Sequence, residues 1–242
     1  RDVTTGTDNQ GHGYQAGATI TTGIKNIVIG VNAGAALTTG NDNIAIGDQA
    51  LNHFNQTNGY RNICIGSLTD TNATDSADQI VLGYDCTGRE DSSFTFGKGT
   101  SDTACNFNST TWATVSDERI KKDITTSTAG LGFINDLRPV TFKWKNAGDI
   151  PTDFRGYVEG STNPCMEGKN STTTNHGFVA QEVKTAMDAH SEIKDGFDMW
   201  SEGSDGRQTI GDSALVPMLV KAVQELSTEN DALKARLTAG GL

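Results

Sequence analysis

The sequence predicts a mainly β N-terminal part, a repetitive trimeric β-stalk or β-roll, followed by an α+β part that ends in a long coiled-coil helix. Three observations lead to this homotrimeric fold class. A short strand-like motif recurs in the first half, the composition changes near residue 115, and an apolar heptad pattern occupies the C-terminus. We therefore expect two domains, residues 1–115 and residues 116–242.

The repeated motif is a β-branched run with apolar residues at alternate positions, closed by a glycine. Its copies are residues 26–30, 43–47, 62–66 and 79–83, with a weaker fifth copy at 93–97. A strand this short cannot bury its apolar face alone, so the copies must stack on neighbours within or between chains. The glycines allow a sharp turn or a positive φ angle at each corner. A β-solenoid, a β-roll and an interleaved trimeric stalk all fit, with unrelated hairpins as the alternative.

The composition and charge change between the two halves. Residues 1–115 contain no proline and only five of the 19 basic residues, whereas all four prolines follow. The formal net charge is −11, and no cluster of basic residues offsets it. Such a chain is poorly suited to bind nucleic acid or an anionic membrane, and its apolar stretches are too short to span a bilayer. We expect no nucleic-acid partner and no membrane insertion.

The cysteines and histidines form no recognisable site. The four cysteines have no CxxC spacing, and the four histidines are scattered along the chain. This pattern predicts neither a disulfide framework nor a metal site, and we expect idle or buried thiols and no cofactor.

The second half alternates short helices, strands and a long loop. A helix over residues 130–137 should end at Arg138 and Pro139, and residues 140–144 alternate as a half-buried strand. Residues 146–175 are typical of a loop. Residues 176–183 lead into a further helix, which carries Val179, Val183 and Met187 on one face.

The C-terminal helix, about residues 213–238, carries the clearest periodicity. Its apolar positions alternate at spacings of three and four, as in a heptad seam: Val216, Leu219, Val223, Leu226, Asn230, Leu233 and Leu237. A polar Asn230 in a seam can fix register and oligomeric state. We expect the helix to trimerise with help from its domain, and packing against its own chain is the alternative.

These motifs resemble known families. The repeats resemble the head repeats of trimeric autotransporter adhesins and the shafts of phage tail fibres. In the second half, Ser116-Asp-x-Arg-x-Lys121-x-x-Ile124, Leu137-Arg-Pro-Val-x-Phe, Gly177-Phe-Val-Ala-Gln-Glu-Val183 and the leucine-rich helix occur in this order. Together they resemble the intramolecular chaperone domain that ends endosialidase tailspikes and other phage fibres, classed as peptidase family S74.

This resemblance implies a single self-cleavage. In the family, the chaperone trimerises, aligns the chains of the upstream shaft and then cuts itself off, here at the Val115–Ser116 bond. Ser116 matches the nucleophile and Lys121 the lysine of a Ser-Lys dyad, with Lys122 as the competing base. Asp117 and His176 are candidates for supporting roles. On the residues alone, Ser116 and Asp117 also fit a helix N-cap, and His176 fits a cap of the next helix.

The chemistry sets two conditions on the dyad. A lysine acts as a base only when its amine is neutral, although the pKa of a free lysine is about 10.4. Burial on assembly and a neighbouring cation such as Arg119 would both favour the neutral amine. Because a five-residue offset places Ser116 and Lys121 about 140° apart on an ideal helix, the two meet only if the segment turns.

We therefore expect the C-terminal part of a phage tail fibre or tailspike. Such a chain is a single-turnover serine endopeptidase with no other substrate; it assembles in the host cytoplasm and resides in the virion tail, and its chaperone domain is released. Its fibre has a bacterial surface receptor as an expected partner. The alternative is a trimeric surface adhesin with a non-cleaving assembly domain. Residues 1–115 offer no convincing carboxylate pair for a glycosidase.

Overall fold

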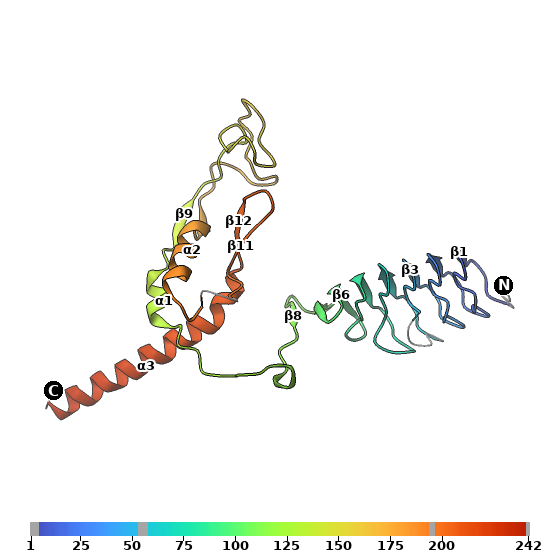
Figure 1. Cartoon of the computed structure of the whole chain (residues 1–242), viewed down its shortest axis with the longest axis horizontal. Coiled ribbons are helices and arrows are strands. Elements are labelled where there is room, and N and C mark those ends of the chain that lie inside the picture. Colours follow the sequence, from blue (N-terminus) through green and yellow to red (C-terminus); the bar gives the residue numbers. More distant parts are fainter. Residues whose placement is uncertain (1–4, 53–57, 194–196, 241–242) are drawn as a thin grey trace. The chain divides into compact units, whose positions relative to one another are not determined.

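The computed structural model describes residues 5–52, 58–193 and 197–240. The chain divides into two compact units, Arg1–Lys122 and Asp123–Leu242, which are described separately (Figure 1). This division follows shortly after the change in composition near residue 115.

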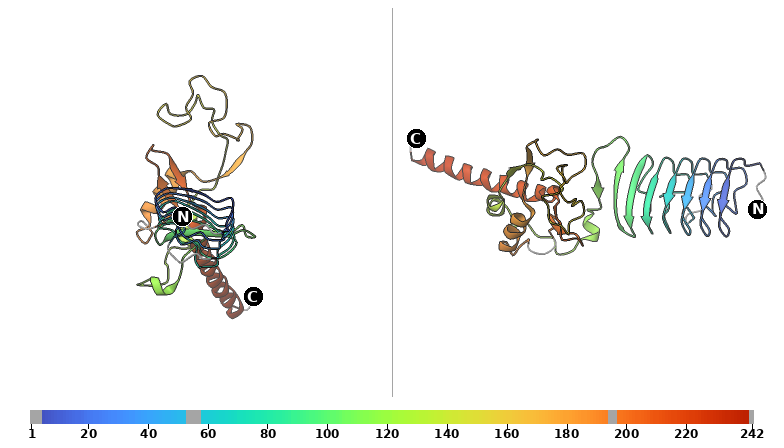
Figure 2. Two further views of the ribbon diagram at one scale, coloured as in Figure 1. Left: turned by 90° about the vertical axis from the view of Figure 1, so that its right-hand side faces the viewer. Right: turned by 90° about the horizontal axis from the view of Figure 1, so that it is seen from above.

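The first unit is a β-solenoid built by one chain. Its eight-stranded sheet runs in sequence order, and each of the first five strands lies parallel to the next (Figure 2). The parallel strands are β1 (Gln10–His12), β2 (Ile27–Ile29), β3 (Ile44–Ile46), β4 (Ile63–Ile65), β5 (Ile80–Tyr84) and β6 (Ser93–Lys98). Antiparallel strands β7 (Ser101–Asn106) and β8 (Ala113–Thr114) complete the sheet. The copies therefore stack on one another within a chain, as a solenoid rather than as unrelated hairpins.

The strands stack in register, with alternate side chains inside the coil. The central residues of four successive strands, Val28, Ala45, Cys64 and Val81, are fully buried in one core. The residues on either side of them point away from the core; Ile29, for example, is exposed. A parallel register repeats this alternation in every coil, so the solenoid has a sealed interior and an apolar outer sheet face.

A ladder of buried asparagines runs beside the strands. Asn26, Asn43 and Asn62 are fully buried, and each occupies the position just before its strand. The side-chain oxygen of Asn26 accepts from both the backbone N–H and the Nδ2 of Asn43, each at 3.0 Å. Nδ2 of Asn43 also donates to the carbonyl of Gly59 at 2.8 Å. Asn62 repeats this pattern, so each coil satisfies polar groups of the next.

The closing glycines form the corners of the coils. Gly30, Gly47, Gly66 and Gly83 all have positive φ angles, between 123° and 144°. A Cβ added at Gly47 would lie 2.6 Å from the carbonyl carbon of Gly66 in the next coil. Both the dihedral angle and the close approach of neighbouring backbones therefore require glycine, as the repeat predicted.

The second unit is a small α+β domain with its own core. Its elements are α1 (Leu131–Asp136), β9 (Val140–Phe142), β10 (Asn175–Gly177), α2 (Ala180–Ala189), β11 (Trp200–Glu202), β12 (Gln208–Ile210), a 3₁₀ turn (Asp212–Ala214) and α3 (Leu215–Ala239). Antiparallel pairs join β9 to β10 and β11 to β12. Phe133, Val183, Met187 and Met199 are among the residues of the buried cluster between the helices. The predicted helices and the strand after Pro139 are confirmed with small changes of length.

Helix α3 leaves its heptad seam in solvent. The helix has 25 residues, and only Leu215 and Ala222 are buried in it. The six apolar seam residues are all exposed: Val216, Leu219, Val223, Leu226, Leu233 and Leu237. The N-terminal half of α3 contacts α1 through a different face, so packing within the chain does not account for the seam. In the described part of the chain, no helix combines the length and apolar character that crossing a bilayer requires.

Candidate functional site

The segment that contains the predicted scissile bond makes one tight turn. Asp117 is extended, with φ −71° and ψ 132°, and a 3₁₀ helix follows at Glu118–Ile120 before Lys121 returns to extended geometry. The backbone N–H of Lys121 donates to the carbonyl of Glu118 at 3.0 Å. The segment is thus a single short turn rather than a continuous helix, which is the condition for Ser116 and Lys121 to meet.

The turn brings Lys121 onto Ser116. Nζ of Lys121 donates to Oγ of Ser116 at 2.6 Å. Lys122 forms no hydrogen bond or ion pair with a side chain that the structure describes. Of the two candidate bases, Lys121 therefore has the geometry for proton exchange with the serine hydroxyl.

Asp117 holds the turn closed from its N-terminal end. Its Oδ1 accepts the backbone N–H of Arg119 at 2.9 Å, as an N-cap residue does. The guanidinium of Arg119 also donates to both carboxylate oxygens, at 2.5 to 3.1 Å. These bonds from the Arg119 side chain and then its backbone lower the pKa of Asp117. The N-cap interpretation holds for Asp117, while Arg119 is engaged with a carboxylate rather than standing as a bare cation beside Lys121.

The dyad is open to solvent in the single chain. Val115 is 50% exposed, and both Ser116 and Lys121 are exposed as well. Water around an exposed amine favours its charged form, so this chain alone does not supply the desolvation that a lysine base needs. The geometry of proton transfer is present in one chain, whereas the environment for it is not.

His176 lies in the other unit, in strand β10. It is exposed and pairs with Thr141 of strand β9. It does not cap the following helix, because the N-cap residue of α2 is Val179 and no side chain bonds there. The interpretation of His176 as a cap is therefore wrong, and a supporting catalytic role stays a prediction.

Two of the sequence motifs are joined by an ion pair. Nε of Arg138, just before β9, donates to Oε2 of Glu182 in α2 at 2.9 Å, and the other ends of the two groups form a second bond. This side-chain hydrogen bonding lowers the pKa of Glu182. A forked arginine–carboxylate pair fixes orientation, so Glu182 has a structural part in the domain.

A histidine clasp, which the sequence did not reveal, joins α1 to the end of α2. Nε2 of His190 lies 2.8 Å from Oδ2 of Asp136, and Nδ1 lies 3.1 Å from Oε1 of Glu192. The hydrogen bond with Asp136, and then that with Glu192, raises the pKa of His190. The ring of Phe133 packs edge-on against the imidazole. His190 therefore packs against a core residue, Phe133, and at the same time pairs with two carboxylates, Asp136 and Glu192.

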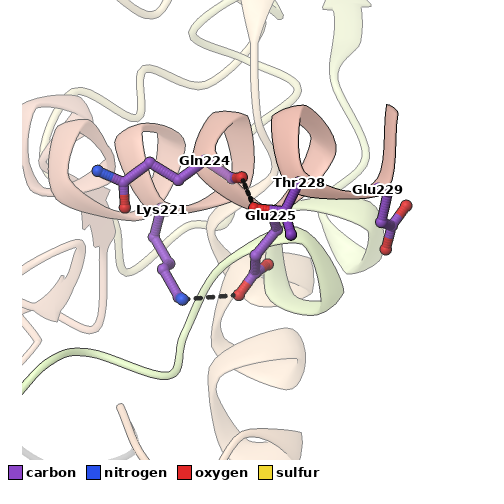
Figure 3. A pocket seen from close by; sticks show the side chains of 5 residues that line it. All are labelled: Lys221, Gln224, Glu225, Thr228 and Glu229. Atoms are coloured by element: carbon purple, nitrogen blue, oxygen red, sulfur yellow. Dashed lines mark hydrogen bonds and ion pairs between the residues drawn. The ribbon is translucent and has the colours of Figure 1, made fainter. Parts of the chain in front are cut away.

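A shallow pocket on α3 marks the joint between α3 and α1. Its lining residues are Lys221, Gln224, Glu225, Thr228 and Glu229 (Figure 3). Oε2 of Glu225 accepts the backbone N–H of Leu131, the first residue of α1, at 2.7 Å, and Oε1 lies 3.3 Å from Nζ of Lys221. These contacts serve the packing of two helices. Among the described residues, no group of His, Cys, Asp and Glu side chains is arranged to hold a metal ion.

Comparison with known families finds one similarity, which covers part of the second half of the chain. Residues 116–192 match the model of peptidase family S74, described as the chaperone of endosialidase. No curated protein and no solved structure matches the chain. The match begins at Ser116, the residue that receives the Lys121 hydrogen bond. The chain therefore has a β-solenoid followed by a segment, residues 116–192, that is similar to the endosialidase chaperone.

Proposed function

We propose that residues 116–242 form an intramolecular chaperone that trimerises, aligns the solenoids of three chains and then releases itself by cutting the Val115–Ser116 bond. The observation that carries this proposal is the 2.6 Å contact of Lys121 Nζ with Ser116 Oγ at the first residue of the family match. Cleavage of a peptide bond by a side chain requires at least a nucleophile and a base within hydrogen-bond distance of each other.

The reaction follows from this pair. Neutral Lys121 accepts the hydroxyl proton of Ser116 as Oγ adds to the carbonyl carbon of Val115. The C–N bond then breaks, the proton passes from Lys121 to the departing Ser116 nitrogen, and the acyl group remains on Oγ as an ester. Water hydrolyses the ester, leaving a carboxylate on Val115 and a free amine on Ser116. Each chain reacts once, because its only substrate is its own peptide bond.

Two exposed apolar surfaces support association of three copies. The first is the exposed heptad seam of α3, in which Asn230 offers a polar contact that specifies register. The second is the outer sheet face of the solenoid, where Ile29, Ile65 and Phe96 remain 41%, 39% and 44% exposed. Contiguous apolar surfaces of this kind usually mark protein interfaces.

The solenoid changes what the chaperone has to align. Strands of one chain already pair with each other in register. Paired residues are 14 to 19 positions apart in the sequence, as Ile80 and Phe94 or Ile44 and Ile63 are. The chaperone therefore does not interleave strands from three chains. It aligns three folded solenoids along their long axes so that their outer apolar faces meet. It does so by raising the local concentration of the chains.

Assembly also supplies the missing environment of the dyad. Burial of Lys121 against neighbouring chains would favour its neutral form, so cutting would follow assembly and not precede it. We place the product in a phage tail fibre or tailspike, with the fibre facing a bacterial surface receptor and the chaperone released after assembly in the host cytoplasm. The resemblance of the two halves to fibre shafts and fibre chaperones supports this location.

The test is the intact mass of the purified chain beside its Ser116→Ala variant. Two fragments from the wild type, the larger beginning at Ser116, and one intact chain from the variant are expected. Leu226→Asp in the α3 seam should give an uncut monomer by light scattering. Ala235→Asp, which adds the same charge to the exposed side of α3 away from the seam, should leave both trimer and cutting intact.

Each alternative outcome is informative. A monomeric Leu226→Asp chain that cuts at the full rate would rule out gating by assembly. An uncut trimer in the wild type would remove the self-cleavage and favour a surface adhesin whose assembly domain stays attached.

A further inference from the structure

The turn that brings Lys121 to Ser116 also brings it near the carboxylate of Asp117. Asp117 adjoins Ser116 in the chain, and Nζ of Lys121 lies 2.6 Å from Oγ of Ser116, so a small change of side-chain conformation would pair the lysine with the carboxylate. In the structure they bind elsewhere, because Asp117 contacts Arg119 and Lys121 contacts Ser116. Arg119 and Lys121 therefore compete for the carboxylate of Asp117. Lys121 stays in contact with Ser116 only when Arg119 binds that carboxylate.

Arg119 has the better geometry for the carboxylate. Its Nε donates to Oδ1 and Oδ2 of Asp117 at 3.0 and 3.1 Å, and a terminal nitrogen donates to Oδ2 at 2.5 Å. A planar guanidinium matches a carboxylate with two parallel bonds, which an ammonium cannot do. The backbone N–H of the same residue adds a fourth contact at 2.9 Å.

We propose that Arg119 is a positioning residue for the self-cleavage: by binding the carboxylate of Asp117, it keeps that carboxylate from Lys121 and leaves the lysine amine to Ser116. This inference rests on the proposed function, because it assigns a role within the same site. Arg119 itself does not touch the reacting atoms.

The charged groups around the dyad are few. The side-chain polar contacts of Asp117 and Lys121 in the described part of the chain all lie within residues 116–121. The other nearby charges in the sequence are Glu118, Lys122 and Asp123, and none of them forms an ion pair with a residue that the structure describes. Asp117 is therefore the carboxylate whose placement decides how strongly the Lys121 ammonium is stabilised.

The direction of the effect follows from electrostatics. A carboxylate beside a lysine stabilises the ammonium and so shrinks the neutral fraction that can accept a proton. Removing Arg119 frees Asp117 to take Lys121 from Ser116. An opposite charge at contact distance moves a titration by about one unit or more, so about tenfold less neutral amine is expected below the midpoint.

The experiment compares pH–rate profiles of self-cleavage in the full chain, started by a pH jump after assembly at low pH. Arg119→Ala should move the profile to higher pH and slow cutting about tenfold on its rising limb. This variant keeps the backbone N–H of residue 119, so the capping bond that Oδ1 of Asp117 accepts from it is unchanged. Adding Asp117→Asn, which keeps a capping oxygen but removes the charge, should return the profile to that of the wild type.

The outcome that overturns the inference is an Arg119→Ala profile with an unchanged midpoint, or a shift that survives the added Asp117→Asn. Lost capping or lost folding would lower the rate at every pH and would not be rescued by the second change. Arg119→Lys, a point charge without the fork, should fall between the wild type and Arg119→Ala.

A second measurement separates this inference from the proposed function. In the uncut Ser116→Ala chain, NMR titration of the Lys121 side chain should shift upward with Arg119→Ala and return with Asp117→Asn. If the wild type never cuts but this shift appears, the proposed cleavage fails while the competition for Asp117 stands. If the wild type cuts and no shift appears, only the role of Arg119 is refuted.

Discussion

Removing one rung of the asparagine ladder should loosen the solenoid by a predictable amount. Asn43→Ala deletes the bond from Nδ2 to the carbonyl of Gly59 and the bond that Oδ1 accepts from the backbone N–H of Asn62. The backbone N–H of buried Asn62 then has no partner, whereas the Gly59 carbonyl still accepts the backbone N–H of Asn41 at 3.2 Å. A buried polar group without a partner costs about 1–3 kcal/mol, so the coil should lose about that much.

A buried thiol in the next coil, two residues after Asn62, reports this loss. Cys64 is fully buried, and burial raises its pKa well above the usual range, so a thiol reagent reacts with it only when the coil opens. A loss of about 2 kcal/mol increases the open population, and therefore the labelling rate of Cys64, about 30-fold. The chain should carry Ser116→Ala so that cleavage does not intervene, and peptide mass spectrometry should locate the label.

The control is Asn108→Ala, which removes the same side chain at an exposed position of the same unit. Its effect on Cys64 labelling should be negligible. If Asn43→Ala labels Cys64 within about threefold of this control, the coil relaxes to satisfy the backbone N–H of Asn62, and the ladder is not a main source of its stability.

Three further predictions follow from other features. Gly47→Ala should lower the thermal unfolding midpoint of the solenoid more than Gly99→Ala, because both glycines have positive φ but only Gly47 abuts the next coil. His190 has a raised pKa in the fold, so the stability that its clasp contributes is complete below about pH 6.5 and lost as pH rises through the raised value; the difference in unfolding midpoint between wild type and His190→Gln should shrink accordingly. Glu225→Ala should speed amide exchange at Leu131, whereas Glu225→Gln, which keeps an acceptor, should not.

The repetition in the sequence was enough to predict the solenoid, but not all of its parts. The alternating isoleucines located β2 to β5 because side chains of a strand alternate between inside and outside. Strand β1, with the sequence Gln-Gly-His, has no apolar residue and is a strand only because it pairs with β2. The buried Asn ladder was also missed, although an Asn at the first position of three copies was its signal.

At the candidate site, the sequence identified the residues but not their arrangement. The spacing of Ser116 and Lys121 could not say whether the segment turns, because that depends on the short 3₁₀ helix and its Asp117 cap. The engagement of Arg119 with Asp117 was likewise invisible, since any nearby charge could have served as partner. The His190 clasp joins residues 54 positions apart, and no local pattern encodes such a contact.

The stacking of coils also means that the length of the solenoid grows by one fixed step per repeat. Neighbouring parallel strands lie about 4.8 Å apart, so gain or loss of one repeat changes the length of the stack by that step alone. The same 17 residues in a helix would add about 25 Å. Because the Asn and Gly positions fix each coil, the loops between them are free to differ in length, and 14-, 17- and 19-residue repeats already coexist here. Duplication of repeats can therefore tune reach finely while each loop diversifies independently.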